Sequence, residues 1–274
     1  MYIVVDIGGT NTRIAGTREL ETITDPIIFD TPQNYQEGIN VIAAQARSLA
    51  GEESIDRMVV GIPATLSQDK RVIIGAATNI PDWSGKKIAD DLEKVMETHV
   101  VLDNDAALVG LGEAHYGAGQ GAELLVYITV STGVNGVRVV GGQIDVSAHS
   151  FSIGHQYLSM ENHAPTWDKL ISGRSIHDRF GMAPRELGKD HPVWEELARV
   201  VAFGLHNSIV HWAPHRVVLG GSMFNEIGIP IERVRFHLKE ITKVTSEITE
   251  IVHSQLGDVG GLWGGMARLK QERM

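Results

Sequence analysis

The sequence turns from a strand to a helix within Val101-Leu-Asp-Asn-Asp-Ala-Ala-Leu-Val-Gly-Leu-Gly-Glu113. Residues 99–102 are apolar and β-branched, as in a buried strand, whereas residues 106–113 favour a helix. Asp103, Asn104 and Asp105 therefore follow the carboxyl end of a strand, where open α/β sheets bind their ligands. From this stretch alone two roles for Asp105 stay open, a chemical one and a cap for free amides at the start of the helix.

The composition predicts a folded soluble protein, because 274 residues that are 43% apolar supply a substantial core. No apolar run approaches the ~20 residues of a membrane span and no leader peptide is apparent, so we expect a cytoplasmic protein without a membrane partner. The 24 basic and 34 acidic residues give a net charge of -10, which opposes nucleic-acid binding. The absence of cysteine excludes disulfides and thiolate zinc sites.

Near the N-terminus, residues 2–6 and 13–16 form two apolar runs on either side of Gly8-Gly9-Thr10-Asn11-Thr12. This order predicts a β-hairpin, and it differs from a Walker loop or a dinucleotide-binding fingerprint because both of those lead into a helix. Glycines at the tip would let backbone amides approach an anion, and Thr10 and Asn11 would add donors. Asp6 would hold magnesium through water. An ordinary tight turn is the alternative.

The following residues alternate between strands and helices, which favours a largely parallel sheet with helices on both faces. We expect strands over 23–29 and 57–61 and a helix over 35–50, and a helix that starts at Asp82 or Ser84 and reaches residue 96.

The pattern of a second unit repeats that of the first, with strands expected at 124–130 and 137–140 around Ser131-Thr-Gly-Val-Asn-Gly136. Two hairpins of one design suggest duplicated domains that face each other across a cleft. A further strand, 216–219, ends at Gly220 and Gly221. Helical patterns cover 166–180, 193–211, 231–239 and 260–270.

Six short motifs occur in the order seen in the ROK family of sugar kinases, which the chain resembles over nearly its whole length: Asp6-Ile-Gly-Gly-Thr-Asn-Thr-Arg13, Asn79-Ile-Pro-Asp-Trp83, Asp103-Asn-Asp-Ala106, Ser131-Thr-Gly133, Ile153-Gly-His155 and Leu219-Gly-Gly221. The resemblance implies an α/β fold of two actin-like (ribonuclease H-like) α/β domains around an interdomain cleft. The N-terminal domain would comprise residues 1–112 and the C-terminal helix at about 260–274, and the second domain residues 113–259.

The same resemblance implies an ATP-dependent phosphotransferase of the glucokinase or hexokinase type, which uses Mg2+ and acts on glucose or a related hexose. Asp105 matches the general base that accepts the proton of a sugar hydroxyl. Four further residues match sugar ligands: Asn79, Asn104, His155 and Asp168. Gly8, Gly9, Thr10, Thr132 and Gly133 match the two phosphate loops, and Gly220 and Gly221 the adenosine loop. Relatives are often dimers, so a homodimer is expected by analogy.

The chain departs from the family pattern at Ser152, where a glutamate usually grips two sugar hydroxyls. It also lacks the cysteine-rich zinc loop after the histidine, so residues 156–167 must support His155 by packing and hydrogen bonds, with Glu161 or His163 as candidate partners. Asp168 is one methylene shorter than the matching family glutamate, which helps to bind the sugar. The alternative is that Asp168 only faces solvent on the surface of a helix.

Several alternatives stay open at this stage. His149, His155 and His163 match no recognised metal site, so no zinc site is expected. Trp83 either borders the sugar cleft or packs in the core. The reduced number of sugar-side carboxylates leaves room for a sugar-binding regulatory protein without catalysis, and the phosphate loops alone would also suit an actin-like ATPase of another substrate class. The family's repressors carry an N-terminal helix-turn-helix, which does not precede the first strand of this sequence.

Overall fold

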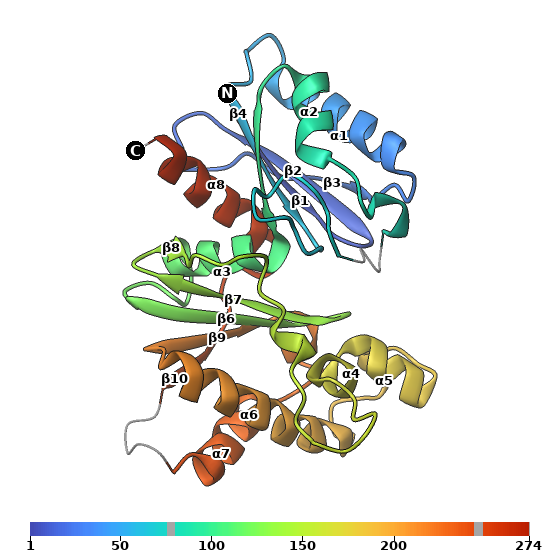
Figure 1. Ribbon diagram of the computed structural model, residues 1–274, viewed down its shortest axis with the longest axis vertical. Helices are drawn as coiled ribbons and strands as arrows, with labels where there is room; N and C mark the ends of the chain where they lie inside the picture. The colour runs from blue at the N-terminus through green and yellow to red at the C-terminus, as the bar shows by residue number, and fades with distance from the viewer. Residues whose placement is uncertain (76–79, 244–248, 274) are drawn as a thin grey trace.

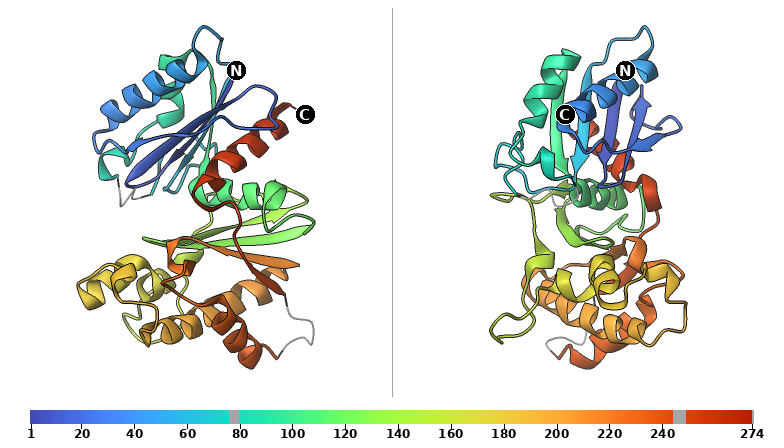
Figure 2. Two further views of the ribbon diagram at one scale, coloured as in Figure 1. Left: turned by 180° about the vertical axis from the view of Figure 1, so that it is seen from behind. Right: turned by 90° about the vertical axis from the view of Figure 1, so that its right-hand side faces the viewer.

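The structure, a computed structural model, describes residues 1–75, 80–243 and 249–273, and it contains two five-stranded sheets (Figure 1). Helices α3 (Asp105–Tyr116) and α8 (Gly260–Arg273) lie between the sheets, and the remaining helices cover their outer faces (Figures 1 and 2). Each sheet is mixed, with a hairpin at one side and parallel strands at the other. No described helix is long and apolar enough to cross a membrane.

The first sheet has the strand order β3-β2-β1-β4-β5. The predicted N-terminal hairpin is confirmed, because β1 and β2 pair antiparallel, and β1, β4 and β5 then run parallel. The predicted strand over 23–29 is shifted, since only its last residues pair with β2. The bounds are β1 Tyr2–Ile7, β2 Asn11–Thr17, β3 Ile27–Asp30, β4 Arg57–Ile62 and β5 His99–Asn104.

Helices α1 (Tyr35–Ala50) and α2 (Ile88–Met96) cover the outer face of this sheet. The side chain of Asn34 caps α1 at its start, and Gly51, with φ 59°, ends it. The prediction that Asp82 or Ser84 starts α2 is wrong. Asp82 instead lies in a 3-10 turn, η1 (Pro81–Trp83), and its carboxylate accepts a hydrogen bond from the Tyr35 amide at the start of α1.

The second sheet has the order β10-β9-β6-β7-β8. The second predicted hairpin is present as β6 and β7, and its turn is shorter than predicted because β7 begins at Val134, which pairs with Val130. β9 and β10 run parallel to β6. The bounds are β6 Leu124–Val130, β7 Val134–Val140, β8 Gln143–Ile144, β9 Arg216–Gly220 and β10 Glu250–His253.

Helices cover the outer face of the second sheet around one large apolar cluster. The helix predicted over 166–180 is in fact two helices, because Ser172 adopts an extended conformation and its hydroxyl caps the second of them. These helices are α4 Trp167–Ile171, α5 Gly173–Phe180, α6 Val193–Trp212 and α7 Ile231–Ile241; short 3-10 turns are η2 Ile153–His155, η3 Pro184–Glu186, η4 Ser222–Phe224 and η5 Gly257–Val259.

The two central helices join the sheets through direct backbone contact. α3 packs on the second sheet and α8 on the first. Where the helices meet, a Cβ on Gly264 would lie 1.7 Å from the Leu108 carbonyl oxygen, and a Cβ on Gly112 2.6 Å from the Gly260 oxygen. Only glycine fits at such distances. The expected domain boundary, after residue 112, falls within α3.

Candidate active site

A cleft of about 380 Å³ opens between the two halves of the molecule, and residues from both sheets line it. From the first half come the β1–β2 turn, the loop after β4 and the junction of β5 with α3; from the second come the β6–β7 turn and the segment around η2 and α4. The cleft brings together nine of the predicted site residues: Gly8, Gly9, Asn104, Asp105, Thr132, Gly133, Ser152, His155 and Asp168.

The remaining predicted residues are not among those that line this cleft. Asp6, Thr10 and Asn11 lie in the β1–β2 hairpin next to the lining glycines. Gly220 and Gly221 follow β9, and Gly221, with φ 93°, has its α-carbon so close to the Val130 carbonyl that a Cβ would lie 2.4 Å from the oxygen. Asn79 lies outside the described residues.

Asp105 stands at the first position of α3, directly after the last residue of β5. The capping role falls mainly to its neighbour, since the Asn104 side chain accepts a hydrogen bond from the Ala107 amide, while Asp105 Oδ1 accepts one from Ala106 at 2.8 Å. Burial raises the pKa of Asp105 to about 6, although the Ala106 amide opposes the shift. The carboxylate is therefore ionised at neutral pH and more basic than an exposed aspartate.

The amide of Asn104 connects both halves of the molecule. Its Nδ2 donates to the Ala64 carbonyl oxygen at 3.2 Å, and its Oδ1 accepts from Asn135 Nδ2, in the second sheet, at 3.2 Å. All three residues line the cleft, and the bond to Asn135 holds the strand-to-helix junction against β7.

Asp6, the penultimate residue of β1, lies near Asp105. A Cβ on Gly61 would lie 3.5 Å from Asp6 Oδ1 and 3.6 Å from the Asp105 α-carbon, so this glycine separates the two residues. Burial, and after it the nearby Asp105 charge, raise the pKa of Asp6 to about 7, although Arg13 opposes the shift. Two half-buried carboxylates that repel each other are a suitable environment for a divalent cation.

The two glycine turns occupy equivalent places in their hairpins. In the first, the Gly8 amide donates to the Asn11 carbonyl at 2.9 Å; in the second, the Ser131 amide donates to the Gly133 carbonyl at 2.8 Å. Each turn ends the first strand of its hairpin, and each contributes residues to the wall of the cleft. The sequence repeat thus corresponds to two turns that line one cleft.

On the opposite side, the segment with His155 is attached to the start of β7. Gly154 lies so close to the Val134 carbonyl that a Cβ would be 2.2 Å from the oxygen, which requires glycine before the histidine. Asp168 Oδ1 accepts a hydrogen bond from the Val134 amide at 2.6 Å. The alternative position for Asp168, on a solvent-facing helix surface, is therefore wrong, because this carboxylate is half-buried and lines the cleft.

The contacts that hold the segment after His155 differ from those anticipated. Gln156 Oε1 accepts from Asn207 Nδ2 of α6 at 3.0 Å, and Tyr157 pairs with Thr166 in an isolated bridge. Glu161 and His163, the two anticipated partners, are solvent-exposed. Within residues 1–75, 80–243 and 249–273, no three His, Asp or Glu side chains gather into a metal-binding group.

Two residues near the motifs have structural positions. Trp83 is fully buried, packs edge-on against Tyr35 with ring centroids 5.3 Å apart, and donates to the Pro32 carbonyl, so of its two possible positions it takes the one in the core. Asp103 is 2% exposed and accepts from Lys70 Nζ at 2.6 Å, and Arg268 Nε of α8 lies 3.6 Å from its other oxygen. These ion pairs occupy Asp103, which is not a lining residue of the cleft.

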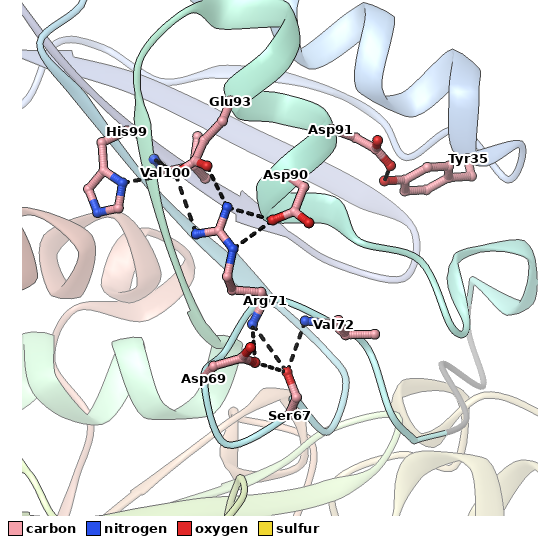
Figure 3. Close-up of polar contacts among 10 residues, drawn as sticks. All are labelled: Tyr35, Ser67, Asp69, Arg71, Val72, Asp90, Asp91, Glu93, His99 and Val100. Carbon is pink, nitrogen blue, oxygen red and sulfur yellow. Dashed lines mark hydrogen bonds and ion pairs between the residues drawn. The ribbon is translucent and has the colours of Figure 1, made fainter.

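The loop that carries Lys70 is held against α2 by a polar network (Figure 3). Arg71 contacts two carboxylates of α2, with Nε 2.6 Å from Asp90 Oδ1 and its terminal nitrogens on Glu93. Ser67 Oγ accepts hydrogen bonds from the amides of Arg71 and Val72. The network fixes the loop between Leu66 and Ile73, which pair in an isolated antiparallel bridge. This loop directly follows Thr65, which lines the cleft.

Eight of the described residues that line the cleft were not predicted as site residues: Pro63, Ala64, Thr65, Thr129, Ser131, Val134, Asn135 and Arg174. Arg174 is the second residue of α5, directly after the break at Ser172. The dipeptide Ser172-Gly173 within an otherwise helical pattern was the available signal, because serine caps helices and glycine weakens their interior.

Comparisons with known proteins agree with this geometry. A glucokinase from Halalkalibacterium halodurans is 33% identical over a segment that covers 60% of this chain and 52% of its own. The crystal structure of a ROK hexokinase from Thermus thermophilus has a TM-score of 0.79 at 26% identity, covering 100% of this chain and 99% of that one. A ROK family glucokinase from Streptomyces griseus, in complex with glucose and AMPPNP, has a TM-score of 0.81 at 22% identity, covering 98% and 99%.

The family model described as the ROK family matches residues 2–272, nearly the whole chain. Both solved structures are ROK proteins that match over almost their full length, so the two sheets and their central helices form the two-domain actin-like fold. The chain therefore belongs to the ROK family.

Proposed function

We propose that this protein transfers the terminal phosphate of ATP to a hydroxyl group of a hexose, glucose or a related sugar, with Asp105 as the general base. The observation that carries the proposal is that one cleft contains Asp105, both glycine turns and the polar residues around His155. Family membership and the similarity to glucokinases and a hexokinase support it.

Asp105 has the properties of a general base for this reaction. A sugar hydroxyl is a poor nucleophile, and a carboxylate that takes its proton as the bond to phosphorus forms typically contributes ~10² to 10⁴ in rate. Burial raises the pKa of Asp105 to about 6, which keeps the group ionised at pH 7 while it increases its basicity. The amide of Ala106 fixes one oxygen of the carboxylate.

The glycine turns would provide the environment for the phosphates. Phosphoryl transfer depends mainly on alignment and on neutralisation of charge, and backbone amides in glycine loops contribute to both. We assign Gly8, Gly9, Thr132 and Gly133 to this role because they line the cleft, with Thr10 and Asn11 beside them. Gly220 and Gly221, at the end of β9, would face the adenosine. Use of ATP is supported by the AMPPNP complex of the Streptomyces griseus glucokinase.

Magnesium fits the environment of Asp6. The carboxylate is half-buried, and its pKa is raised to about 7 by desolvation and by the charge of Asp105, so a cation would relieve both effects. We propose that Asp6 holds Mg2+ through a water molecule. The ion would supply charge neutralisation at the phosphates.

We assign the sugar to the side of the cleft formed by Asn104, Ser152, His155 and Asp168. Asp168 and the 3-10 turn with His155 both contact Val134, so one rigid strand end positions both side chains. We also propose two domains. Residues 1–112 and 260–274 form the domain that contains the β1–β2 turn, and residues 113–259 form the domain that contains the β6–β7 turn. Closure of two such domains would exclude water.

A coupled assay of ADP release tests the proposal. Purified protein is incubated with magnesium-ATP and each of glucose, fructose, mannose, allose and the N-acetylated hexosamines. We expect turnover with at least one hexose, and a loss of ~10² to 10⁴ in kcat for Asp105→Asn. No turnover with any sugar, or an Asp105→Asn variant as fast as the parent, would refute it. Light scattering after size exclusion tests the homodimer that we propose by analogy with relatives.

Ser152 supports a second candidate, a sugar-binding regulator without catalysis. This residue lines the cleft at the place where the family usually has a glutamate, so one carboxylate that grips sugar hydroxyls is replaced by a hydroxyl. Sugar binding in calorimetry without any ADP release would favour the regulator, and turnover would favour the kinase.

A further inference from the structure

Arg174 places a guanidinium group in the wall of the cleft beside the second glycine turn. It is the second residue of α5 and lines the same cleft as Thr132, Gly133 and Asp168. The motifs that identify the family do not include this residue, and the reaction as described above does not use it.

The backbone next to Arg174 is attached directly to the glycine turn. The Gly173 amide donates to the Ser131 carbonyl oxygen at 2.7 Å, and a Cβ on Gly173 would lie 3.0 Å from the same oxygen. Ser172, 1% exposed, accepts from the Ser175 amide and so fixes the first turn of α5. The guanidinium therefore starts from a backbone position that is rigid relative to the turn.

The charge of the cleft requires a cation near the phosphates. The described residues that line it include two carboxylates, Asp105 and Asp168, and a third, Asp6, lies next to Asp105. Arg174 is the one lining residue among them with a permanent positive charge. Backbone amides carry no net charge, so a polyphosphate entering this acidic site needs a compensating side chain besides any bound metal.

We propose that Arg174 binds the phosphate groups of the nucleotide through charge-assisted hydrogen bonds. This inference rests on the proposed kinase function and names a phosphate-binding residue for it. A planar guanidinium matches two phosphate oxygens at once, whereas a sugar offers neutral hydroxyls that gain less from a full charge. The residue before Arg174 is hydrogen-bonded to the Ser131–Gly133 turn, which we assign to the phosphates, so phosphate is the favoured ligand over the sugar.

The test compares Arg174→Ala and Arg174→Lys with a matched control, Arg179→Ala. Arg179 lies on the same helix, is solvent-exposed, pairs with Glu196 at 2.6 Å and does not line the cleft. For Arg174→Ala we expect a rise of about 10- to 100-fold in the KM for ATP and in the Kd of magnesium-ADP, measured by calorimetry. Arg174→Lys should recover part of this loss, and adenosine, which lacks phosphates, should bind all variants equally.

Two results would overturn the inference. One is an Arg174→Ala variant whose ATP KM and ADP Kd stay within twofold of the parent. The other is a variant whose KM rises for the sugar alone, because Arg174 would then orient Asp168. If the parent protein binds magnesium-ADP but phosphorylates no sugar, the proposed function fails, while the ADP affinities of the variants still decide the role of Arg174. Equal melting temperatures of Arg174→Ala and Arg179→Ala exclude misfolding as the cause of a loss.

Discussion

Asp105→Asn should make the protein both less active and more stable, and the size of the stability gain follows from the environment of this side chain. Burial raises the pKa of Asp105 from 3.8 to about 6, a difference of about two units. Each unit corresponds to ~1.4 kcal/mol, so the ionised carboxylate destabilises the folded state by about 3 kcal/mol at pH 8. Asparagine keeps the shape and an acceptor for Ala106 but carries no charge.

The sign of the pH dependence can be worked out from the same shift. Because the pKa is higher in the folded state than in the unfolded chain, the folded state binds more protons between pH 3.8 and pH 6. The contribution of Asp105 to stability is therefore largest below pH 3.8 and is lost as the pH rises through about 6. The uncharged variant lacks this loss, so its advantage should be about 3 kcal/mol at pH 8 and roughly half of that at pH 5.

Thermal unfolding of the parent and Asp105→Asn at both pH values measures the effect. We expect the variant to melt about 5 °C higher at pH 8 and to lose about half of this advantage at pH 5. Asp178→Asn, an exposed position on α5, is the control and should leave the melting temperature unchanged. For the active parent, kcat/KM should decline below about pH 6 as Asp105 becomes protonated.

Our account of this residue would be wrong if Asp105→Asn failed to raise the melting temperature at pH 8. It would also be wrong if the gain were the same at both pH values, since a pH-independent gain would point to packing. A stabilised variant that keeps full activity would support the burial of the carboxylate but would contradict its role as the base.

Three further substitutions test the framework of the site. Lys70→Ala should lower the free energy of unfolding by about 1 to 2 kcal/mol in urea titrations, because it removes the cation 2.6 Å from the buried Asp103, while Lys70→Arg should retain most of it. Gly264→Ala should destabilise the protein by more than about 3 kcal/mol, since the new Cβ would lie 1.7 Å from a carbonyl oxygen of α3. Gly265→Ala, whose Cβ would meet the side chains of Val4 at 3.0 Å and Val59 at 3.6 Å, is the milder comparison. Glu113→Gln should lower the melting temperature by several degrees, corresponding to about 1 to 3 kcal/mol, because the buried carboxylate accepts from three backbone amides and an amide side chain must direct its NH2 group at one of them.

The strands and both hairpins could be predicted because their signals are local. Apolar runs of five to seven residues that lead into a turn with glycine and threonine appear at each hairpin, and the structure pairs the strands as anticipated. The junction before Asp105 was equally readable, since the polar residues follow the last apolar residue of β5 at once. The gathering of these segments around one cleft was expected from the resemblance to a family.

Features that depend on the partner of a side chain were less accessible. Trp83 follows a polar turn, and no local pattern shows that its ring fills the space above Gly38. Asp82 looks like the cap of the helix that follows it, yet it binds the amide of Tyr35, which lies 47 residues earlier. The position of Arg174 depended on a helix break that apolar periodicity does not register, because Ile171 and Ile176 are both buried on either side of it.

The placement of α8 has a consequence for biosynthesis. This helix is the last element of the described chain, yet it covers the inner face of the sheet that is translated first, through Leu262, Met266 and Leu269 against Val4 and Val59. Until residues 260–273 leave the ribosome, α8 cannot cover that apolar face. The face therefore stays exposed in the nascent chain while about 150 residues between β5 and α8 are synthesised. Chaperone binding to arrested nascent chains should therefore persist until α8 emerges, and a chain in which α8 is moved ahead of β1 by circular permutation should be released earlier.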